Sequence, residues 1–97
     1  MAQVIYTGEA LDDIERVFAF PARRDLYPAD AAVAAIRDAV SILSEHPLIG
    51  RALEVPLREL VISFGDTGYL ALYRFRPERD EDRILALRHQ RELDYGA

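Results

Sequence analysis

Apolar residues in the first half of the chain recur at helical spacing. The first stripe lies in a segment that ends at about residue 20, before a proline, and comprises Leu11, Ile14 and Phe18. The second stripe begins after Pro28, ends before Pro47 and comprises Val33, Ile36, Val40 and Leu43. Thr7 precedes the first segment, and its hydroxyl is predicted to cap that helix. The pattern therefore predicts two helices that form an antiparallel hairpin.

The second half of the chain alternates between apolar and polar positions, as strands do. Three strands are predicted at 60–64, 69–76 and 83–88, and another at 4–6, before the first helix. Both faces of the segment 69–76 are largely apolar, so it is predicted to lie at the centre of the sheet. The charged segment 77–82 is predicted to form a hairpin loop that faces solvent.

These elements predict an α+β fold with the order β-α-α-β-β-β. The helical hairpin would pack on a three- to four-stranded, mainly antiparallel sheet, and a short extra strand around 51–55 would add to it. With 97 residues, the chain is predicted to be a single domain, 1–97. The predicted core is the set Leu11, Ile14, Phe18, Val33, Ile36, Val40, Leu43, Leu60, Ile62, Leu72 and Leu85.

The composition argues against several classes of function. The chain has no cysteine and only two histidines, His46 and His89, so neither a disulfide nor a metal site is expected, and no cofactor is predicted. No apolar run approaches the ~20 residues that cross a bilayer, so a membrane partner is not expected. The N-terminus lacks the pattern of a signal peptide, and we therefore expect a cytoplasmic protein.

Charge is distributed unevenly along the chain, whose net charge is −5. Residues 1–46 have a balance of −4 and residues 77–97 a balance of −2, whereas residues 47–76 carry four arginines against three acids. A net acidic domain is a poor general binder of nucleic acid, because the neutralisation of phosphates dominates that affinity. Local arginine clusters still offer sites for anions.

Five blocks of the sequence follow one another in an order seen in a known family of toxins. They are the segments 10–14, 47–51, 57–62, 68–74 and 84–92. In this order they resemble the RelE/ParE family of bacterial type II toxin–antitoxin systems. The resemblance implies a toxin that inhibits growth, contributes to plasmid stabilization and is silenced by a cognate antitoxin. It leaves the target open, because some members cleave messenger RNA on the ribosome and others inhibit DNA gyrase.

The nuclease branch of the family differs from this chain at three positions. Those nucleases resemble one another in carrying lysines where this chain has Val61 and Ser63, and an arginine where it has Leu70. RNA cleavage without a metal requires a base, a proton donor and cations that stabilise the phosphorane. Neutral side chains supply no such cations, so no complete nuclease site is visible, and the sequence does not decide whether the chain is an enzyme. The comparison favours the ParE-like branch.

The C-terminal region keeps the catalytic candidates, which are His89, Arg91 and Tyr95. Nucleases of the family carry a basic residue and a tyrosine near these positions. Imidazole titrates near neutral pH, so His89 suits general acid or base chemistry. The alternative interpretation is a partly buried histidine at a strand end, together with a tyrosine that only packs near the C-terminus.

Arginines on the predicted strands offer a second kind of site. Arg74 and Arg76 share a strand face, and Arg58 and Arg88 are expected to neighbour them across the sheet. Such a patch would bind an acidic antitoxin segment, or the target, through bidentate contacts. The alternative is a set of surface arginines paired with glutamates, each pair contributing less than about 1 kcal/mol.

Three functions remain open on the sequence alone. The first is a toxin that inhibits DNA gyrase, which the acidic net charge and the missing nuclease cations favour. The second is a ribosome-dependent mRNA endonuclease that uses His89 and Arg91. The third is a catalytically degenerate member that only binds its antitoxin.

Overall fold

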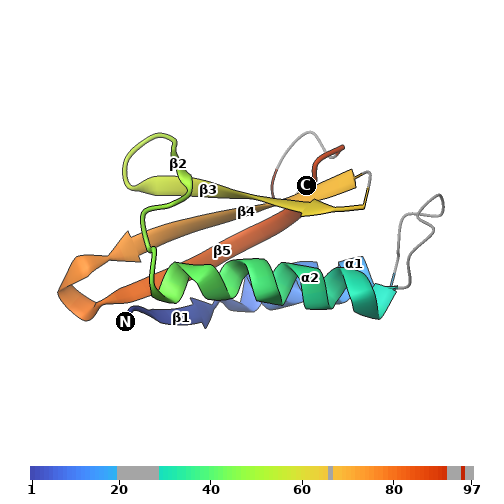
Figure 1. The fold of residues 1–97 in the computed structure, drawn as a ribbon, viewed down its shortest axis with the longest axis horizontal. Coiled ribbons are helices and arrows are strands. Elements are labelled where there is room, and N and C mark those ends of the chain that lie inside the picture. Colours follow the sequence, from blue (N-terminus) through green and yellow to red (C-terminus); the bar gives the residue numbers. More distant parts are fainter. Residues whose placement is uncertain (20–28, 66, 92–94, 96–97) are drawn as a thin grey trace.

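The computed structural model describes residues 1–19, 29–65, 67–91 and 95. In this part of the chain, two helices cover one face of a five-stranded sheet (Figure 1). The predicted α+β order is confirmed, with a short strand added before the last three. In chain order the elements are β1 (Gln3–Tyr6), α1 (Gly8–Ala19), α2 (Ala29–Ser41), the 3-10 helix η1 (Ile42–Ser44), β2 (Arg51–Ala52), β3 (Leu57–Phe64), β4 (Thr67–Arg76), the 3-10 helix η2 (Pro77–Arg79) and β5 (Glu81–His89).

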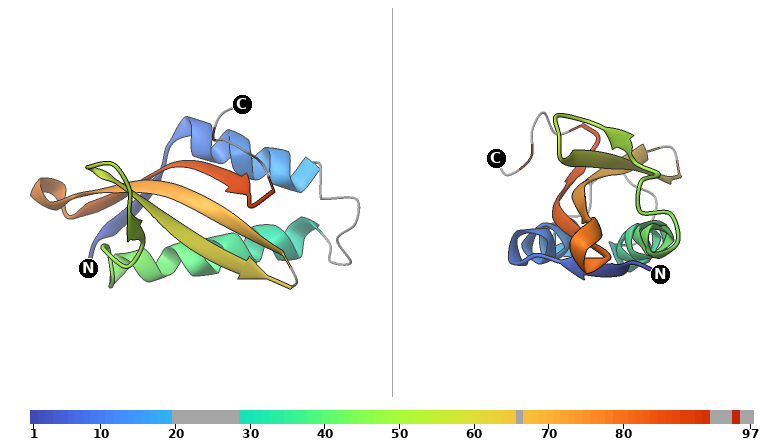
Figure 2. Two further views of the ribbon diagram at one scale, coloured as in Figure 1. Left: turned by 90° about the horizontal axis from the view of Figure 1, so that it is seen from above. Right: turned by 90° about the vertical axis from the view of Figure 1, so that its left-hand side faces the viewer.

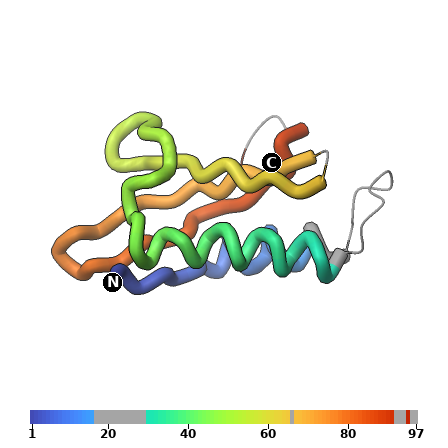
Figure 3. The backbone as a smooth tube through the Cα atoms, viewed as in Figure 1, coloured from blue at the N-terminus to red at the C-terminus, as the bar shows by residue number. Residues whose placement is uncertain are grey.

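The strands lie in the order β1-β5-β4-β3-β2, so β4 is central, as predicted. β1 runs parallel to β5, and the other neighbouring pairs are antiparallel. The short extra strand predicted around 51–55 is confirmed as β2, which pairs with β3 and brings the sheet to five strands instead of three to four. Two further views show both helices side by side on the same side of the sheet (Figure 2), and the Cα tube shows the path of the chain from α2 to the strands (Figure 3).

The core lies between the helices and the sheet. The face of β4 that meets the helices carries aromatic and small side chains, each at most 3% exposed: Tyr69, Ala71 and Tyr73. Two further predicted residues, Val33 and Leu60, pack against this core with partial burial. The predicted core residues that are confirmed as buried are Ile14, Ile36, Val40, Leu43 and Ile62.

The prediction of burial is wrong for three residues. Leu11 is 47% exposed, because α1 turns the fully buried Ala10 toward the sheet in its place. Leu72 lies on the face of β4 opposite the helices and is only partly buried. Leu85 falls at a β-bulge, where the register of β4 and β5 shifts, and it is also only partly buried. The side chain of Phe18 lies outside the described residues.

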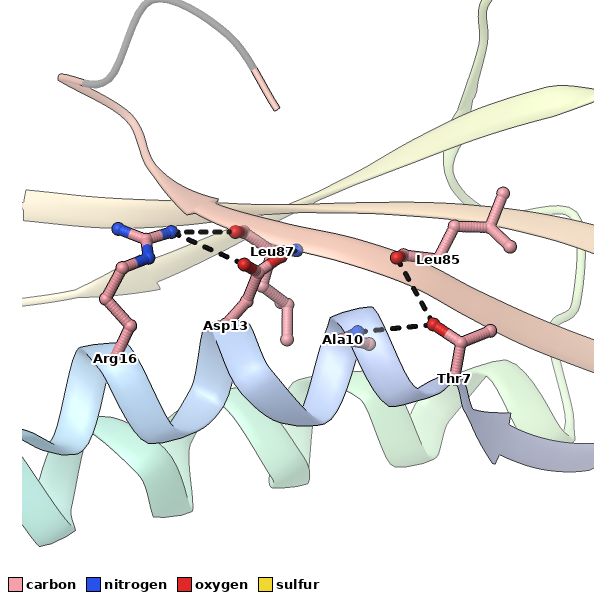
Figure 4. A network of polar contacts seen from close by, with 6 residues as sticks. All are labelled: Thr7, Ala10, Asp13, Arg16, Leu85 and Leu87. Carbon is pink, nitrogen blue, oxygen red and sulfur yellow. Dashed lines mark hydrogen bonds and ion pairs between the residues drawn. The ribbon is translucent and has the colours of Figure 1, made fainter. Parts of the chain in front are cut away.

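The start of α1 is fixed by the predicted cap. Thr7 Oγ1 accepts a hydrogen bond from the backbone N–H of Ala10 at 3.2 Å. The same hydroxyl donates to the carbonyl of Leu85 at 3.3 Å, which ties the helix start to β5 (Figure 4). The hydroxyl of Thr7 therefore caps α1 and also links this helix to a strand that is distant in sequence.

The charged segment 77–82 is not a solvent-facing loop throughout, so that prediction is wrong in part. η2 and Asp80, whose φ is 47°, reverse the chain, and β5 begins directly afterwards. Glu81 and Asp82 are 5% and 0% exposed. They are buried because β1, from the other end of the chain, pairs with them in parallel.

Candidate functional site

The face of the sheet opposite the helices, which we name the open face, gathers arginines from three strands. Arg74 and Arg76 belong to it because they alternate along β4 with the core residue Tyr73. Strand register places two glutamates on the same face, Glu59 and Glu81. With five arginines against two acids, its strands have a balance of +3 in a chain of net charge −5. The five are Arg51, Arg74, Arg76, Arg83 and Arg88.

Glu59 lies at the centre of the open face and is only 4% exposed. Its Oε1 accepts hydrogen bonds from Arg51 Nε at 3.2 Å and Nη2 at 2.7 Å, and its Oε2 accepts one from the Tyr95 hydroxyl at 2.6 Å. Burial raises the pKa of Glu59, but the hydrogen bonds from Tyr95 and Arg51 and the charge of Arg88 outweigh burial and hold that pKa below its usual value. Glu59 therefore stays ionised and fixes the C-terminal tyrosine on this face.

Tyr95 completes a stack at the same place. The Arg88 guanidinium lies over its ring at 5.0 Å from the ring centre, a cation–π contact. Burial and the neighbouring Glu59 raise the pKa of Tyr95, so its hydroxyl remains a proton donor to the carboxylate. Tyr95 therefore packs between two partners, the carboxylate of Glu59 and the guanidinium of Arg88.

The end of the open face near η2 carries three arginines, Arg74, Arg76 and Arg83. Arg83 pairs with Glu81 at 3.0 Å, and Arg76 pairs with Glu78 of η2 at 3.2 Å. Arg74 is exposed and lies directly opposite Arg83 on the neighbouring strand. Like charges directly opposite in a sheet destabilise it, and an anion bound between them relieves the repulsion. This end is therefore suited to a carboxylate or phosphate from a partner.

Arg58 does not belong to the open face, although the sequence suggested that it neighbours the other arginines. Its guanidinium donates to the carbonyl of Leu48 at 3.1 Å and to that of Gly50 at 2.8 Å. It pairs across the sheet with the core residue Tyr73, whose hydroxyl accepts from the Gly50 N–H at 2.9 Å. Arg58 thus holds the segment between η1 and β2 in place.

A family comparison matches residues 4–94 to the ParE toxin of type II toxin-antitoxin system, parDE. This chain belongs to the ParE toxin family. It is thus the toxin component of a type II toxin–antitoxin system, and its partner is an antitoxin. No curated protein sequence matches the chain.

Solved structures share the fold of this ParE-family toxin. The chromosomal ParDE toxin–antitoxin system from P. aeruginosa superposes with a TM-score of 0.71 at 24% identity, over 92% of this chain and 96% of that one. The RelBE2 toxin–antitoxin complex from Mycobacterium tuberculosis gives 0.64 at 26% identity, over 92% and 98%. The intact E. coli RelBE complex gives 0.64 at 11% identity, over 90% and 94%.

The positions compared with the nucleases lie on the open face of this ParE-family toxin. Val61 and Leu70 are opposite one another on β3 and β4, and Ser63 follows on β3. None of the three carries charge, and Val61 is 61% exposed. The ionised Glu59 lies next to them on the same face, where it is paired with Arg51, and Arg88 lies opposite Leu70 on β5. These three positions themselves therefore supply no cation that would stabilise a phosphorane.

Two of the catalytic candidates of the toxin, His89 and Tyr95, do not converge. His89 pairs with Tyr69 and lies on the helix side of the sheet, away from Tyr95. Its Nδ1 accepts from the backbone N–H of Arg91 at 3.1 Å, and its Nε2 lies 2.5 Å from Thr67 Oγ1. Both ring nitrogens therefore contact groups within the chain, as expected for a partly buried histidine with a structural role at a strand end.

Two residues of the open face were missed from the sequence, Arg51 and Arg83. The alternation of Glu59 with Val61 and Ser63 along β3 is the sequence signal that places all three side chains on one face. Within the described residues, no group of three or more His, Asp or Glu side chains is placed to hold a metal ion. No helix in that part of the chain is long and apolar enough to span a membrane.

Proposed function

We propose that this ParE-family toxin inhibits DNA gyrase and is neutralised when an acidic antitoxin segment binds to the open face. The observation that carries the antitoxin contact is charge segregation: a face with a balance of +3 in a chain of −5. An acidic segment complements it, and electrostatic complementarity accelerates association and fixes register. Gyrase acts in the cytoplasm, which is therefore the proposed location.

Gyrase is proposed as the target, in preference to messenger RNA, because of the side chains at three positions of the open face. An RNA-cleaving site needs cations around the scissile phosphate. Here Val61, Ser63 and Leu70 are neutral, and the arginines near them are engaged within the chain, Arg51 by Glu59 and Arg88 by the ring of Tyr95. His89, a candidate for an alternative nuclease site, lies on the helix side of the sheet, and its Nδ1 accepts a hydrogen bond from the backbone N–H of Arg91.

The target is tested with purified toxin in a gyrase supercoiling assay. We expect inhibition at micromolar toxin, and restoration of supercoiling when the cognate antitoxin is added first. In cells that express the toxin alone, filamentation with DNA damage is expected. New codon-phased 5′ ends in primer extension, with supercoiling unaffected, would replace gyrase by the ribosome. Normal growth with neither effect would indicate a degenerate member that only binds its antitoxin.

The antitoxin contact is tested by charge reversal and calorimetry. Arg74→Glu and Arg88→Glu should each weaken antitoxin binding by about 2–5 kcal/mol if the side chain sits at the centre of the interface. Arg79→Glu, on the exposed hairpin tip, is the matched control and should leave affinity nearly unchanged. Arg76→Glu is expected to have a smaller effect, because Arg76 already pairs with Glu78. Wild-type affinity in all reversals would mean that the antitoxin binds elsewhere, on the helices.

A further inference from the structure

The end of the open face nearest β2 holds an anion site that the chain fills with its own carboxylate. Arg51 of β2 lies directly opposite Glu59 of β3, so the two side chains share this face. Arg51 Nε and Nη2 both donate to Oε1 of Glu59, at 3.2 Å and 2.7 Å. The same side of a guanidinium binds a phosphate through two parallel hydrogen bonds. In this toxin a carboxylate from the neighbouring strand therefore takes the place that a phosphate would use.

The second oxygen of the Glu59 carboxylate is held from the C-terminal side. Oε2 accepts a hydrogen bond from the Tyr95 hydroxyl at 2.6 Å. The Arg88 guanidinium lies over the Tyr95 ring, 5.0 Å from its centre, so a second cation lies beside the carboxylate. Two guanidinium groups and a hydroxyl thus converge on one anion, and they are groups that also bind phosphate oxygens.

The burial of Glu59 distinguishes this arrangement from an ordinary surface ion pair. The Arg51 side chain is 70% exposed, whereas that of Glu59 is 4% exposed. A carboxylate on a solvated surface leaves its partner at little cost. Glu59 would have to give up three charge-assisted hydrogen bonds before an external anion could take its place. The carboxylate is therefore a fixed occupant of the site.

We propose that Glu59 sets the selectivity of the open face, as an internal anion that excludes RNA phosphates from the site formed by Arg51, Arg88 and Tyr95. With Glu59 these two arginines have a local balance of +1, and without its charge they would have +2. The inference rests on the proposed function, because it identifies a residue that prevents RNA from being the target. At the η2 end of the face, Arg74 is exposed and stays accessible to the carboxylates of an antitoxin.

Glu59→Gln tests the proposal, because it removes the charge and keeps the size of the side chain. Its amide oxygen still accepts from Arg51 or Tyr95, so the fold should persist, which circular dichroism and thermal melting verify. Fluorescence anisotropy with a short, labelled single-stranded RNA measures binding. The affinity of Glu59→Gln for this RNA should exceed that of wild type by about tenfold, which one charge-assisted contact to phosphate supplies. The plot of log affinity against log salt should steepen by about 0.7, the value for one further phosphate.

Two control variants separate the site from the net charge of the toxin. Glu15→Gln, at an exposed position of α1, changes the net charge equally and should leave RNA affinity at the wild-type value. Arg51→Gln, added to Glu59→Gln, should remove the gain, because the new phosphate contact is made through Arg51. An equal gain from Glu15→Gln, or a gain that survives the loss of Arg51, would overturn the proposal.

NMR of the wild-type toxin provides a measurement that needs no variant. Inorganic phosphate at millimolar concentration should shift the Nε–H signal of Arg74 and leave that of Arg51 in place, because Glu59 already occupies the Nε side of Arg51. A shift of the Arg51 signal as large as that of Arg74 would overturn the proposal, and this result decides if Glu59→Gln does not fold.

The outcomes separate this inference from the proposed function. Cleavage of messenger RNA by the wild-type toxin would overturn the proposed function, and the inference with it. Inhibition of gyrase by wild type, together with unchanged RNA affinity in a folded Glu59→Gln variant, would overturn the inference alone.

Discussion

At the scale of single residues, the carboxyl group of Asp82 has the least favourable surroundings. It is fully buried on the core side of β5, between Val4 of β1 and Phe75 of β4. Neither of its oxygens has a hydrogen-bond partner in the structure. Burial, followed by the charge of Asp80, raises the pKa of Asp82 to about 7. The folded chain therefore holds this proton far more tightly than the unfolded chain does.

This shift predicts how stability depends on pH. A raised pKa of Asp82 in the folded state contributes stability that is complete below the unfolded value of 3.8 and is lost as pH rises through about 7. Asp82→Asn removes the ionisation, so at pH 8 the variant should exceed wild type in unfolding free energy, by about 1–4 kcal/mol. At pH 5 the advantage should be smaller, and it should disappear only below about 3.8, where the carboxyl is protonated in both states. Urea denaturation at both pH values measures this, with Asp12→Asn, at an exposed position of α1, as control. Equal pH slopes for wild type and Asp82→Asn would contradict it.

At the scale of elements, the segment between η1 and β2 is held by the strands rather than by itself. Arg58 binds two of its carbonyls, and the Tyr73 hydroxyl binds the N–H of Gly50. A side chain at Gly50 would lie 2.6 Å from the Tyr73 ring and 2.9 Å from the Glu59 carbonyl, closer than real contacts allow. Close packing of backbone on a buried ring therefore requires glycine at this position.

Alanine at position 50 should accordingly destabilise the toxin. Gly50→Ala forces apart η1, β3 and β4, and overpacking of this kind costs about 1–3 kcal/mol. Gly8→Ala is the control, because nothing lies within 4 Å of a side chain placed at this first position of α1. It should be neutral or slightly stabilising. Melting temperatures of the two variants give the comparison, and equal values would mean that Tyr73 moves aside at little cost.

At the scale of the whole molecule, charge is divided between two layers. The strands of the open face have a balance of +3, so the rest of the chain has −8 to reach the total of −5. The helix hairpin carries much of this negative charge, with Asp12, Glu15 and Asp38 all exposed. The molecule is therefore a dipole, which orients an approaching acidic partner toward the sheet.

This asymmetry predicts a strong effect of salt on antitoxin association. Raising ionic strength from about 0.05 M to about 0.5 M shortens the range of electrostatic attraction and should lower the association rate constant by about tenfold or more. Stopped-flow or surface-based kinetics measure the rate. The double variant Arg74→Glu, Arg83→Glu should show a much weaker dependence on salt. An association rate that is independent of salt would show that the open face does not guide the encounter.

The sequence by itself determined what depends on neighbours along the chain. Helical periodicity located α1 and α2, and the hydroxyl of Thr7 marked the start of α1. The apolar residues on both faces of β4 placed it at the centre of the sheet. The pattern also indicates the side of the sheet on which Arg58 lies, because Arg58 alternates in phase with Leu60 and Ile62, which face the helices. These features follow from backbone geometry, which repeats over a few residues.

Tertiary structure alone decided which distant segments meet. Parallel pairing with β1 buries Asp82, although the acidic run around it suggested an exposed loop. The bulge at Leu85 has a similar effect on the open face. In a regular strand Arg83 and Arg88 would point to opposite sides, but one unpaired residue between them brings both to the same side. No local sequence pattern predicts such a bulge, because it depends on how β5 pairs with β4 and on the contact of Leu85 with Thr7.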